Sequence, residues 1–437
     1  MTGFEPATTC TPCKCATRLR YIPNIEILYK AISKELQELF YISIAKIKIR
    51  IYSFRGITTA KGKKMNCICP PDYDNSLVNL SNSFLRHFDC PQWHSTLAPL
   101  DEQLAERRCK NVILLVLDGM GMDMLKHNLP EDSFFRRHIV ADISSVYPPT
   151  TTAATTSIYS GKTPKEHGMA GWQCYFKEYG KNIELFTNRD SYTQEQLDVN
   201  VSRDFLAYKK LYEQIREQGK YQAYGVAVPW GDFSVKDFDD ICLKIKELCR
   251  RPGEKFILSY HKEPDHTMHR TGCYSAETRK IIKNLEQKVQ KLCASLKDYL
   301  LVITADHGLL DIKKTVLLNE VAEINGCLCQ PPAIEPRTVA FYLKDGKSEA
   351  FKENFNCLFG ADYKLLTADE YLNGGWLGEG EQHPKLRDFV GDYVALATGE
   401  IMLEYQTPEG VPPLSLTAHH AGLTEKEMRV PLIVCKM

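Results

Sequence analysis

Six acidic and histidine side chains stand beside short apolar stretches of this chain, in a pattern suited to holding metal ions. They are Asp118 after Val112–Leu117, Asp265 and His269 after Phe256–Tyr260, Asp306 and His307 after Tyr299–Thr304, and His420 before the last apolar stretch. Carboxylates gathered without matching Lys or Arg repel one another unless cations lie between them. Asp and His side chains are sound ligands for Zn²⁺ and Mn²⁺. The pattern therefore predicts a metal site.

Each of these residues also has a simpler interpretation. Asp118 alone fits a helix cap, because Asp is a favoured N-cap residue. Asp306, followed by His and Gly, fits a turn. Asp265 and His269 fit a hydrogen-bonded pair one helical turn apart. Only the recurrence of such residues after successive strands favours a shared site.

The elements that must position these side chains indicate an α/β fold. Short apolar strands alternate with longer amphipathic helices, which is typical of a largely parallel sheet. Helices are expected over Asp204–Gln218 and Asp239–Arg251, with a third capped by Ser275, and strands over Thr338–Leu343 and Tyr393–Ala397. In a parallel sheet the carboxyl ends of the strands share one edge, so the six side chains are expected to converge there. The polar and aromatic segment 173–200 is expected to be irregular surface or a lid.

The motifs around these residues resemble those of the alkaline phosphatase superfamily, most closely its type I phosphodiesterase/nucleotide pyrophosphatase branch. The matching segments, in the order of that branch, are LDGMG, VYPPTTTAATTSIYSGKTPKEHG, EPDHTMH, TADHG and HHAGLTEKEMRVPLIV, and together they span about Val112–Val434. The resemblance implies a three-layer αβα sandwich with a largely parallel central sheet, as in alkaline phosphatase.

The resemblance also implies a role for each matching residue. One metal ion would be held by Asp118, Asp306 and His307 together with the nucleophile, and the other by Asp265, His269 and His420. His420 is preferred to His419 because it precedes Ala-Gly-Leu. Counting from either end of the second motif places the nucleophile at Thr151. The alternative is that the threonine run simply caps a helix over Thr152–Tyr159.

One departure from the branch concerns the phosphate contact. The animal ecto-enzymes have an asparagine soon after the His-Gly pair that helps hold the phosphate oxygens, whereas this chain has Gly171 and Trp172. The departure leaves both that contact and a nucleotide substrate open. Trp172 and Tyr175 are candidates for stacking on a base or an aromatic leaving group, with packing in a lid as the alternative for each.

The function that the resemblance implies is hydrolysis of a small-molecule phosphoric ester. It would depend on two divalent metal ions, with Zn²⁺ expected and Mn²⁺ as the alternative, and would pass through a phospho-threonine intermediate. The alternatives are a phosphomonoesterase, a phosphonate hydrolase or a phosphomutase of the same superfamily, and a relative that binds without catalysis. The oligomeric state stays open.

Charge and composition limit the other classes of function. Residues 1–64 carry 12 Lys and Arg against 4 Glu, a net charge of +8, so residues 65–437 carry −8. The net negative charge of residues 65–437 argues against nucleic-acid binding through a broad basic surface. No stretch reaches the roughly 18 apolar residues of a membrane span. The 16 cysteines are scattered and follow no evident secretory leader, which indicates a reduced, cytoplasmic protein.

The domain organisation is expected to be simple. Residues 1–64 resemble a peptide that arises when the surroundings of a transfer-RNA gene are translated by mistake, so they are interpreted as an annotation artefact or a disordered extension. A basic arm that contacts a membrane or a partner is the competing interpretation. Residues 65–437 are expected to form one catalytic domain. Within it, residues 309–416 form a less regular pocket wall that includes Glu335 and Arg337, the latter as an anion clamp or a surface salt bridge.

Overall fold

The computed structural model of this protein describes residues 68–436 apart from 107, 229–230 and 406–415. The chain divides into two compact units, Met1–Met65 and Asn66–Met437, and all described residues belong to the second. The predictions for residues 1–64 lie outside the described residues. The interpretation of residues 65–437 as a single catalytic domain stays a prediction.

A six-stranded sheet carries the strands that the sequence analysis placed before the candidate ligands. In spatial order its strands are β2 (Ile139–Ser144), β17 (Arg429–Lys436), β8 (Tyr299–Thr304), β1 (Asn111–Leu117), β7 (Lys255–His261) and β6 (Gln222–Val226). The pairs β8–β1, β1–β7 and β7–β6 are parallel, and β17 runs antiparallel to both of its neighbours. The expected largely parallel sheet is confirmed.

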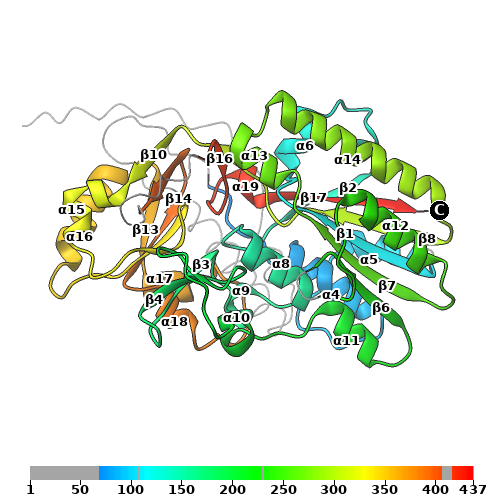
Figure 1. The fold of residues 1–437 in the computed structure, drawn as a ribbon, viewed down its shortest axis with the longest axis horizontal. Helices are drawn as coiled ribbons and strands as arrows, with labels where there is room; N and C mark the ends of the chain where they lie inside the picture. The colour runs from blue at the N-terminus through cyan, green and yellow to red at the C-terminus, as the bar shows by residue number, and fades with distance from the viewer. Residues whose placement is uncertain (1–67, 107, 229–230, 406–415, 437) are drawn as a thin grey trace, which may run out of the picture. The chain divides into compact units, whose positions relative to one another are not determined.

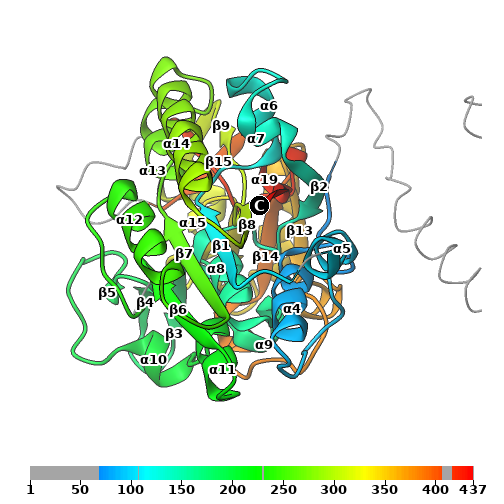
Figure 2. The same cartoon turned by 90° about the vertical axis from the view of Figure 1, so that its right-hand side faces the viewer.

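Helices cover both faces of this sheet, which completes the expected three layers. One layer contains α6 (Met122–Asn128), α7 (Phe134–Arg137), α12 (Phe238–Cys249) and α14 (Ala276–Ser295), and the other contains α4 (Leu77–His87), α5 (Ala98–Glu106), α8 (Thr151–Ser160) and α11 (Leu211–Glu217). Figure 1 shows α14 and α6 above the sheet and α4 and α11 below it, and Figure 2 shows the same two layers in a view along the strands.

Local sequence explains these elements directly. Strand β1 reads NVILLVL and is buried along its whole length, as expected for a central strand with helices on both faces. Helix α14 begins after Ser275, whose side chain accepts a hydrogen bond from the backbone N–H of Thr278. One stripe of α14, including Ile282 and Val289, is buried against the sheet, while its other faces carry charged residues.

A second, entirely antiparallel sheet has seven short strands. In spatial order they are β13 (Tyr363–Thr367), β14 (Tyr393–Ala397), β12 (Thr338–Phe341), β11 (Ala333–Glu335), β3 (Gln173–Phe176), β4 (Lys181–Glu184) and β5 (Arg189–Asp190). Side chains alternate between its faces: Val339 and Phe341 join one apolar cluster, whereas Ala340 joins another. This sheet lies beyond the carboxyl ends of the parallel strands, to the left in Figure 1.

Shorter elements complete the described fold. They are α9 (Pro164–His167), α10 (Val201–Phe205), α13 (Asp265–Thr271), η1 (Leu318–Glu320), α15 (Ala322–Asn325), α16 (Ser348–Phe359), α17 (Ala368–Asn373), α18 (Leu386–Phe389), α19 (Glu425–Met428) and two strand pairs, β10 (Lys314–Leu317) with β15 (Ile401–Glu404) and β9 (Leu310–Asp311) with β16 (Ala418–His419). The pair β10–β15 is parallel and the pair β9–β16 is antiparallel.

Three of the predicted elements need correction. The segment 173–200 is not irregular throughout, because it contributes β3, β4 and β5, whose strands of four, four and two residues are too short to show a clear period. The helix expected over Asp204–Gln218 is instead two helices, with α10 ending at Phe205 and α11 beginning at Leu211. The segment 309–416 is more regular than expected, since it supplies four strands of the second sheet.

Two further observations concern the chain's environment. Among the residues that the structure describes, no helix combines the length and the apolar composition needed to cross a membrane. The cysteines in the same part of the chain form no disulfide bonds. The cytoplasmic location stays a prediction.

Candidate metal centre and active site

The candidate ligands from the central strands lie together at one edge of the six-stranded sheet. Asp118 follows β1 directly, Asp306 follows β8 by two residues, and Asp265 begins α13 shortly after β7. Because β1 pairs in parallel with both β7 and β8, the three carboxyl ends reach the same edge. The backbone N–H of Asp265 donates to the carbonyl oxygen of Asp118 at 3.0 Å, so the two ligand segments are joined directly.

A glycine after Asp118 makes this close approach possible. Gly119 has a φ of +72°, in the left-handed region that favours glycine. A Cβ atom at this position would lie 2.9 Å from Cβ of Asp265 and 2.6 Å from Cδ1 of Leu309. The turn after β1 can therefore pass beside α13 only without a side chain.

Asp265 and His269 lie one turn apart on α13 and both face the centre of the site. Nε2 of His269 is 3.2 Å from Oδ1 of Asp265, so both ligand atoms point to the same place. Nδ1 of His269 lies 2.8 Å from the carbonyl oxygen of Ala418, an acceptor only, so Nδ1 carries the proton and Nε2 is left available as a ligand. Although burial opposes it, His269 lowers the pKa of the Asp265 carboxyl below its usual value.

The C-terminal loop brings His420, not His419, into the same group. Nε2 of His420 is 4.0 Å from Oδ1 of Asp265, and its Nδ1 donates to the carbonyl oxygen of Pro149 at 3.2 Å. The Nδ1 atom of His419 instead contacts the backbone of His420. Burial and the neighbouring histidines keep the pKa of His420 well below its usual value, so its imidazole is neutral, the form that binds metal ions.

His307 connects the carboxylates to the predicted nucleophile. Its Nε2 atom lies 3.4 Å from Oδ1 of Asp118, 3.6 Å from Oδ2 of Asp306 and 3.2 Å from Oγ1 of Thr151. The other oxygen of Asp306, Oδ1, accepts the backbone N–H groups of Gly119 and His307. Those two bonds orient Asp306 so that Oδ2 faces the site.

Three buried carboxylate oxygens in this group have no hydrogen-bond partner: Oδ1 of Asp118, Oδ1 of Asp265 and Oδ2 of Asp306. Buried acceptors without partners are costly, and carboxylates this close repel one another. Burial, followed by the charges of Asp306 and Asp265, raises the pKa of Asp118 well above its usual value. Cations between the carboxylates would satisfy these oxygens and remove the repulsion, so the residues present fit a metal centre.

The geometry places Asp265 more centrally than the sequence analysis did. One set of ligand atoms within 4.8 Å of one another comes from Asp265, His269 and His420. A second such set comes from Asp118, Asp265 and His307, so Asp265 lies between the two predicted metal positions. Asp306 lies next to the second set, because its Oδ2 atom is 3.6 Å from Nε2 of His307.

Thr151 is the first residue of α8, at the edge of this group. The helix begins one residue earlier than expected, with Thr150 as its N-cap residue. The side chain of Thr150 does not cap the helix. Its hydroxyl instead donates to Oε1 of Glu335 at 2.5 Å. The capping interpretation of the threonine run therefore does not account for these side chains.

Two residues around the ligands were not assigned a role from the sequence. Tyr260, near the end of β7, donates its hydroxyl hydrogen bond to Oδ2 of Asp118. Glu335, at the end of β11, is only 5% exposed and also accepts the backbone N–H of Trp172 at 2.8 Å. Glu335 was expected in the pocket wall, but no local signal indicated its contacts, because its partners lie far away in the sequence.

The two residues predicted as substrate contacts, Trp172 and Tyr175, lie just before and within β3 and are both partly buried. The indole of Trp172 packs edge-on against Phe186, with ring centroids 6.1 Å apart, while its backbone joins Glu335. The ring of Tyr175 packs against Tyr342 at 5.2 Å. Both rings therefore have aromatic packing partners, and their role as substrate contacts stays a prediction.

The two interpretations of Arg337 are wrong. Its side chain is fully buried, and Nε donates to Oε1 of Glu427 at 2.6 Å while Nη2 donates to Oε2 at 2.9 Å. The pair is therefore neither a surface salt bridge nor free to bind a substrate anion. Glu427 also accepts the backbone N–H of Gly422, two residues after His420, which ties the ion pair to the ligand loop.

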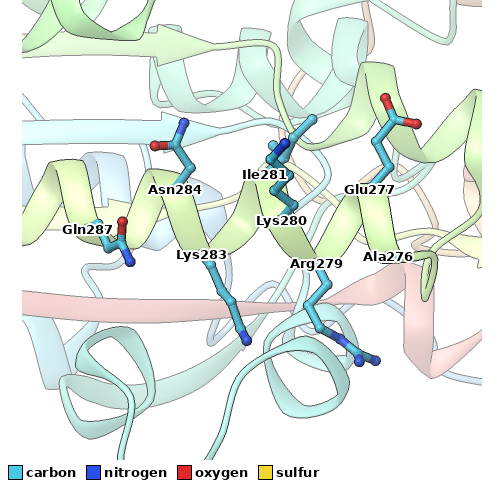
Figure 3. Close-up of a pocket in the computed structure, with 8 residues that line it drawn as sticks. All are labelled: Ala276, Glu277, Arg279, Lys280, Ile281, Lys283, Asn284 and Gln287. Atoms are coloured by element: carbon cyan, nitrogen blue, oxygen red, sulfur yellow. The ribbon is translucent and has the colours of Figure 1, made fainter.

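A surface depression lies elsewhere, along the solvent side of α14 (Figure 3). It is lined by Ala276, Glu277, Arg279, Lys280, Ile281, Lys283, Asn284 and Gln287. None of the candidate ligands lines it. All of its lining residues belong to a single helix, so it offers no converging groups from different elements, as catalysis requires.

Solved structures of other proteins share this fold. Murine ectonucleotide pyrophosphatase/phosphodiesterase 5 superposes with a TM-score of 0.57 at 19% identity, covering 74% of this chain and 87% of that chain. An inactive form of it in complex with AMP gives 0.56 at 18%, with the same coverage. Phosphonoacetate hydrolase from Sinorhizobium meliloti, in complex with phosphonoformate, gives 0.53 at 16% and covers 74% of this chain and 89% of that chain.

At these identities the similarity concerns the fold, and family membership comes from the sequence profile. The profile of the type I phosphodiesterase / nucleotide pyrophosphatase family matches residues 112–372, more than half of the chain. This protein belongs to that family, so the predicted family and fold are confirmed. No curated protein sequence matches the chain at a significant level.

Proposed function

We propose that this protein hydrolyses phosphoric diesters with Thr151 as its nucleophile and two divalent metal ions as cofactors. The observation that carries the proposal is the position of Thr151: its Oγ1 atom lies 3.2 Å from Nε2 of His307, beside carboxylate oxygens that have no protein partner. Membership of the type I phosphodiesterase family supports the same reaction class.

The cluster of Asp, His and Thr side chains divides into one set of ligands for each ion. Asp118, Asp306, His307 and Thr151 would hold one ion, and Asp265, His269 and His420 the other. A set of oxygen and imidazole nitrogen ligands suits Zn²⁺, with Mn²⁺ as the alternative. When bound, the ions lower the pKa of the nucleophile's hydroxyl and neutralise charge that develops on the attacking and leaving oxygens.

The chain's own groups position the reactants. Thr151 begins the ten-residue helix α8, so free backbone N–H groups and the helix dipole point toward the phosphoryl oxygens. The hydroxyl of Thr151 loses its proton to solvent and its oxygen forms a bond to phosphorus. The bond from phosphorus to the leaving oxygen breaks, and the leaving group takes up a proton from solvent and departs as an alcohol or phenol. Water then cleaves the phospho-threonine ester, which restores Thr151 and releases a phosphate monoester.

The experiment that tests this proposal compares two variants of the same helix. Thr151→Ala is expected to abolish turnover of a bis-aryl phosphate while the bound metal per chain remains, because all six Asp and His ligands keep their positions. Thr156→Ala, further along α8 and buried away from the ligands, serves as the control and is expected to retain turnover. Full activity of Thr151→Ala would exclude the covalent route, and turnover that survives a chelator would exclude the metal ions.

A further inference from the structure

Glu335 brings a carboxyl group into contact with both segments that flank the predicted nucleophile. Its Oε1 atom accepts the hydroxyl of Thr150 at 2.5 Å and the backbone N–H of Trp172 at 2.8 Å. Both donors use the same oxygen, so these two contacts leave Oε2 without a donor from either residue. The residue next to Thr150 is the proposed nucleophile Thr151, so the carboxyl group is held against the segment that carries the nucleophile.

Neither hydrogen-bond donor to Glu335 carries a positive charge, because one is a hydroxyl group and the other a backbone N–H. Arg337, two residues further along, directs its guanidinium group to Glu427 instead. Two metal-ligand residues also influence the pKa of Glu335, since the charge of His269 lowers it and the charge of Asp265 raises it, so the carboxyl group lies within electrostatic reach of the ligand group. Burial is the largest cause that raises the pKa of Glu335, to about 7, so the group is ionised at mildly alkaline pH.

We propose that Glu335 is a specificity-determining residue that selects substrates by charge, favouring phosphate diesters over phosphate monoesters. The proposal rests on the proposed function of Thr151 as the nucleophile. At about pH 8 a phosphate monoester carries close to two negative charges, because its second pKa is about 6, whereas a diester carries one. Bound cations attract both substrates, but a fixed carboxylate beside the phosphoryl group penalises the additional charge of the monoester.

The first experiment removes the charge and keeps the shape. Glu335→Gln retains an oxygen that accepts from Thr150 and Trp172 but carries no charge. We expect the ratio of kcat/KM for a mono-aryl phosphate to that for a bis-aryl phosphate to rise roughly tenfold or more at about pH 8. Glu335→Asp keeps the charge, so its ratio is expected to remain near that of the wild-type protein even where both rates fall.

A matched control removes one carboxylate from a neighbouring strand. Glu404 lies on β15, and burial raises its pKa to about 7 as well. Unlike Glu335, it has no hydrogen bond to the nucleophile segment. Glu404→Gln is therefore expected to leave the ratio unchanged. An equal loss of activity toward both esters in Glu335→Gln, with no change in their ratio, would show that Glu335 only holds Thr150 in place and would overturn the proposal.

A binding experiment separates this proposal from the proposed function. In the metal-loaded Thr151→Ala protein, calorimetry compares the affinity for inorganic phosphate with that for dimethyl phosphate. Adding Glu335→Gln is expected to raise the affinity for phosphate relative to dimethyl phosphate by roughly tenfold. An unchanged relative affinity would overturn charge selection even where Thr151 is confirmed as the nucleophile. If Thr151→Ala still hydrolyses both esters, the proposed function fails, and the affinity ratio still tests the charge effect on its own.

Discussion

Replacing Arg337 with Met should destabilise the protein strongly, because it leaves a buried charge without a partner. The guanidinium group makes two hydrogen bonds to Glu427, at 2.6 and 2.9 Å, and donates to the carbonyl oxygens of Ile401 and Gly399 at 2.8 and 2.9 Å. Both side chains of the ion pair are fully buried. Removing one member of such a pair typically costs about 3–5 kcal/mol, against a total stability of about 5–15 kcal/mol for a folded protein.

Urea unfolding provides the measurement. Arg337→Met is expected to lower the unfolding midpoint at an unchanged slope. Arg108→Met breaks an exposed pair with Glu254 and is the matched control, for which no measurable change is expected. Combining Arg337→Met with Glu427→Gln removes the uncompensated charge and should recover part of the loss. A wild-type midpoint for Arg337→Met would refute the reasoning.

The same change should also weaken metal binding. Glu427 accepts the backbone N–H of Gly422 at 2.7 Å and the hydroxyl of Thr424 at 2.7 Å, so it holds the loop that carries His420. When Arg337 is absent, the carboxylate is no longer fixed and the loop loses its anchor. We therefore expect Arg337→Met to hold less metal per chain than Arg108→Met, as measured by elemental analysis of the purified proteins.

Three other perturbations have defined outcomes. Burial raises the pKa of Glu335 from 4.5 to about 7, so the folded state holds this proton more tightly than the unfolded state, and stability falls as pH rises from about 4.5 to about 7. Glu335→Gln should reduce this pH-dependent decrease in the free energy of unfolding by about 3 kcal/mol. The measurement is the difference between the unfolding free energies at about pH 5 and about pH 8, and the same difference in the variant and the wild-type protein would contradict the prediction. His420→Gln should lower the bound metal per chain while His419→Gln preserves it, and equal losses would argue against the assignment. Asp118→Asn should stabilise the chelator-treated protein by on the order of 1 kcal/mol or more, because it removes one of three crowded carboxylates; a lower unfolding midpoint would show that they do not repel.

The central strands could be predicted because their signals are local. A wholly apolar run such as Val112–Leu117 is long enough to identify a buried strand, and Tyr299–Thr304 has the same bounds in the structure as in the prediction. The alternation with amphipathic helices then indicated a parallel sheet, and a parallel sheet brings its carboxyl ends together. This reasoning placed Asp118, Asp265 and Asp306 at one edge before any coordinates were known.

The short strands and the broken helix were not predictable in the same way. Strands β3 and β4 have four residues each. The polar and aromatic sequence around them has no hydrophobic periodicity that would distinguish a strand from a loop. Strand β11 has only three residues, and it is held by pairing with β12 and β3. Such elements exist because neighbouring strands satisfy their backbone groups, which is a property of the assembled sheet rather than of the segment.

The amino-acid sequence by itself determined the types and the order of the site residues, and through strand periodicity the edge of the sheet where they meet. Only the tertiary structure decided that Asp265 lies between both ligand sets, that Glu335 contacts Thr150, and that Arg337 is paired with Glu427. The last two contacts join residues 185 and 90 positions apart. Burial and charge pairing depend on what the whole chain packs around a side chain, so a local pattern carries no information about them.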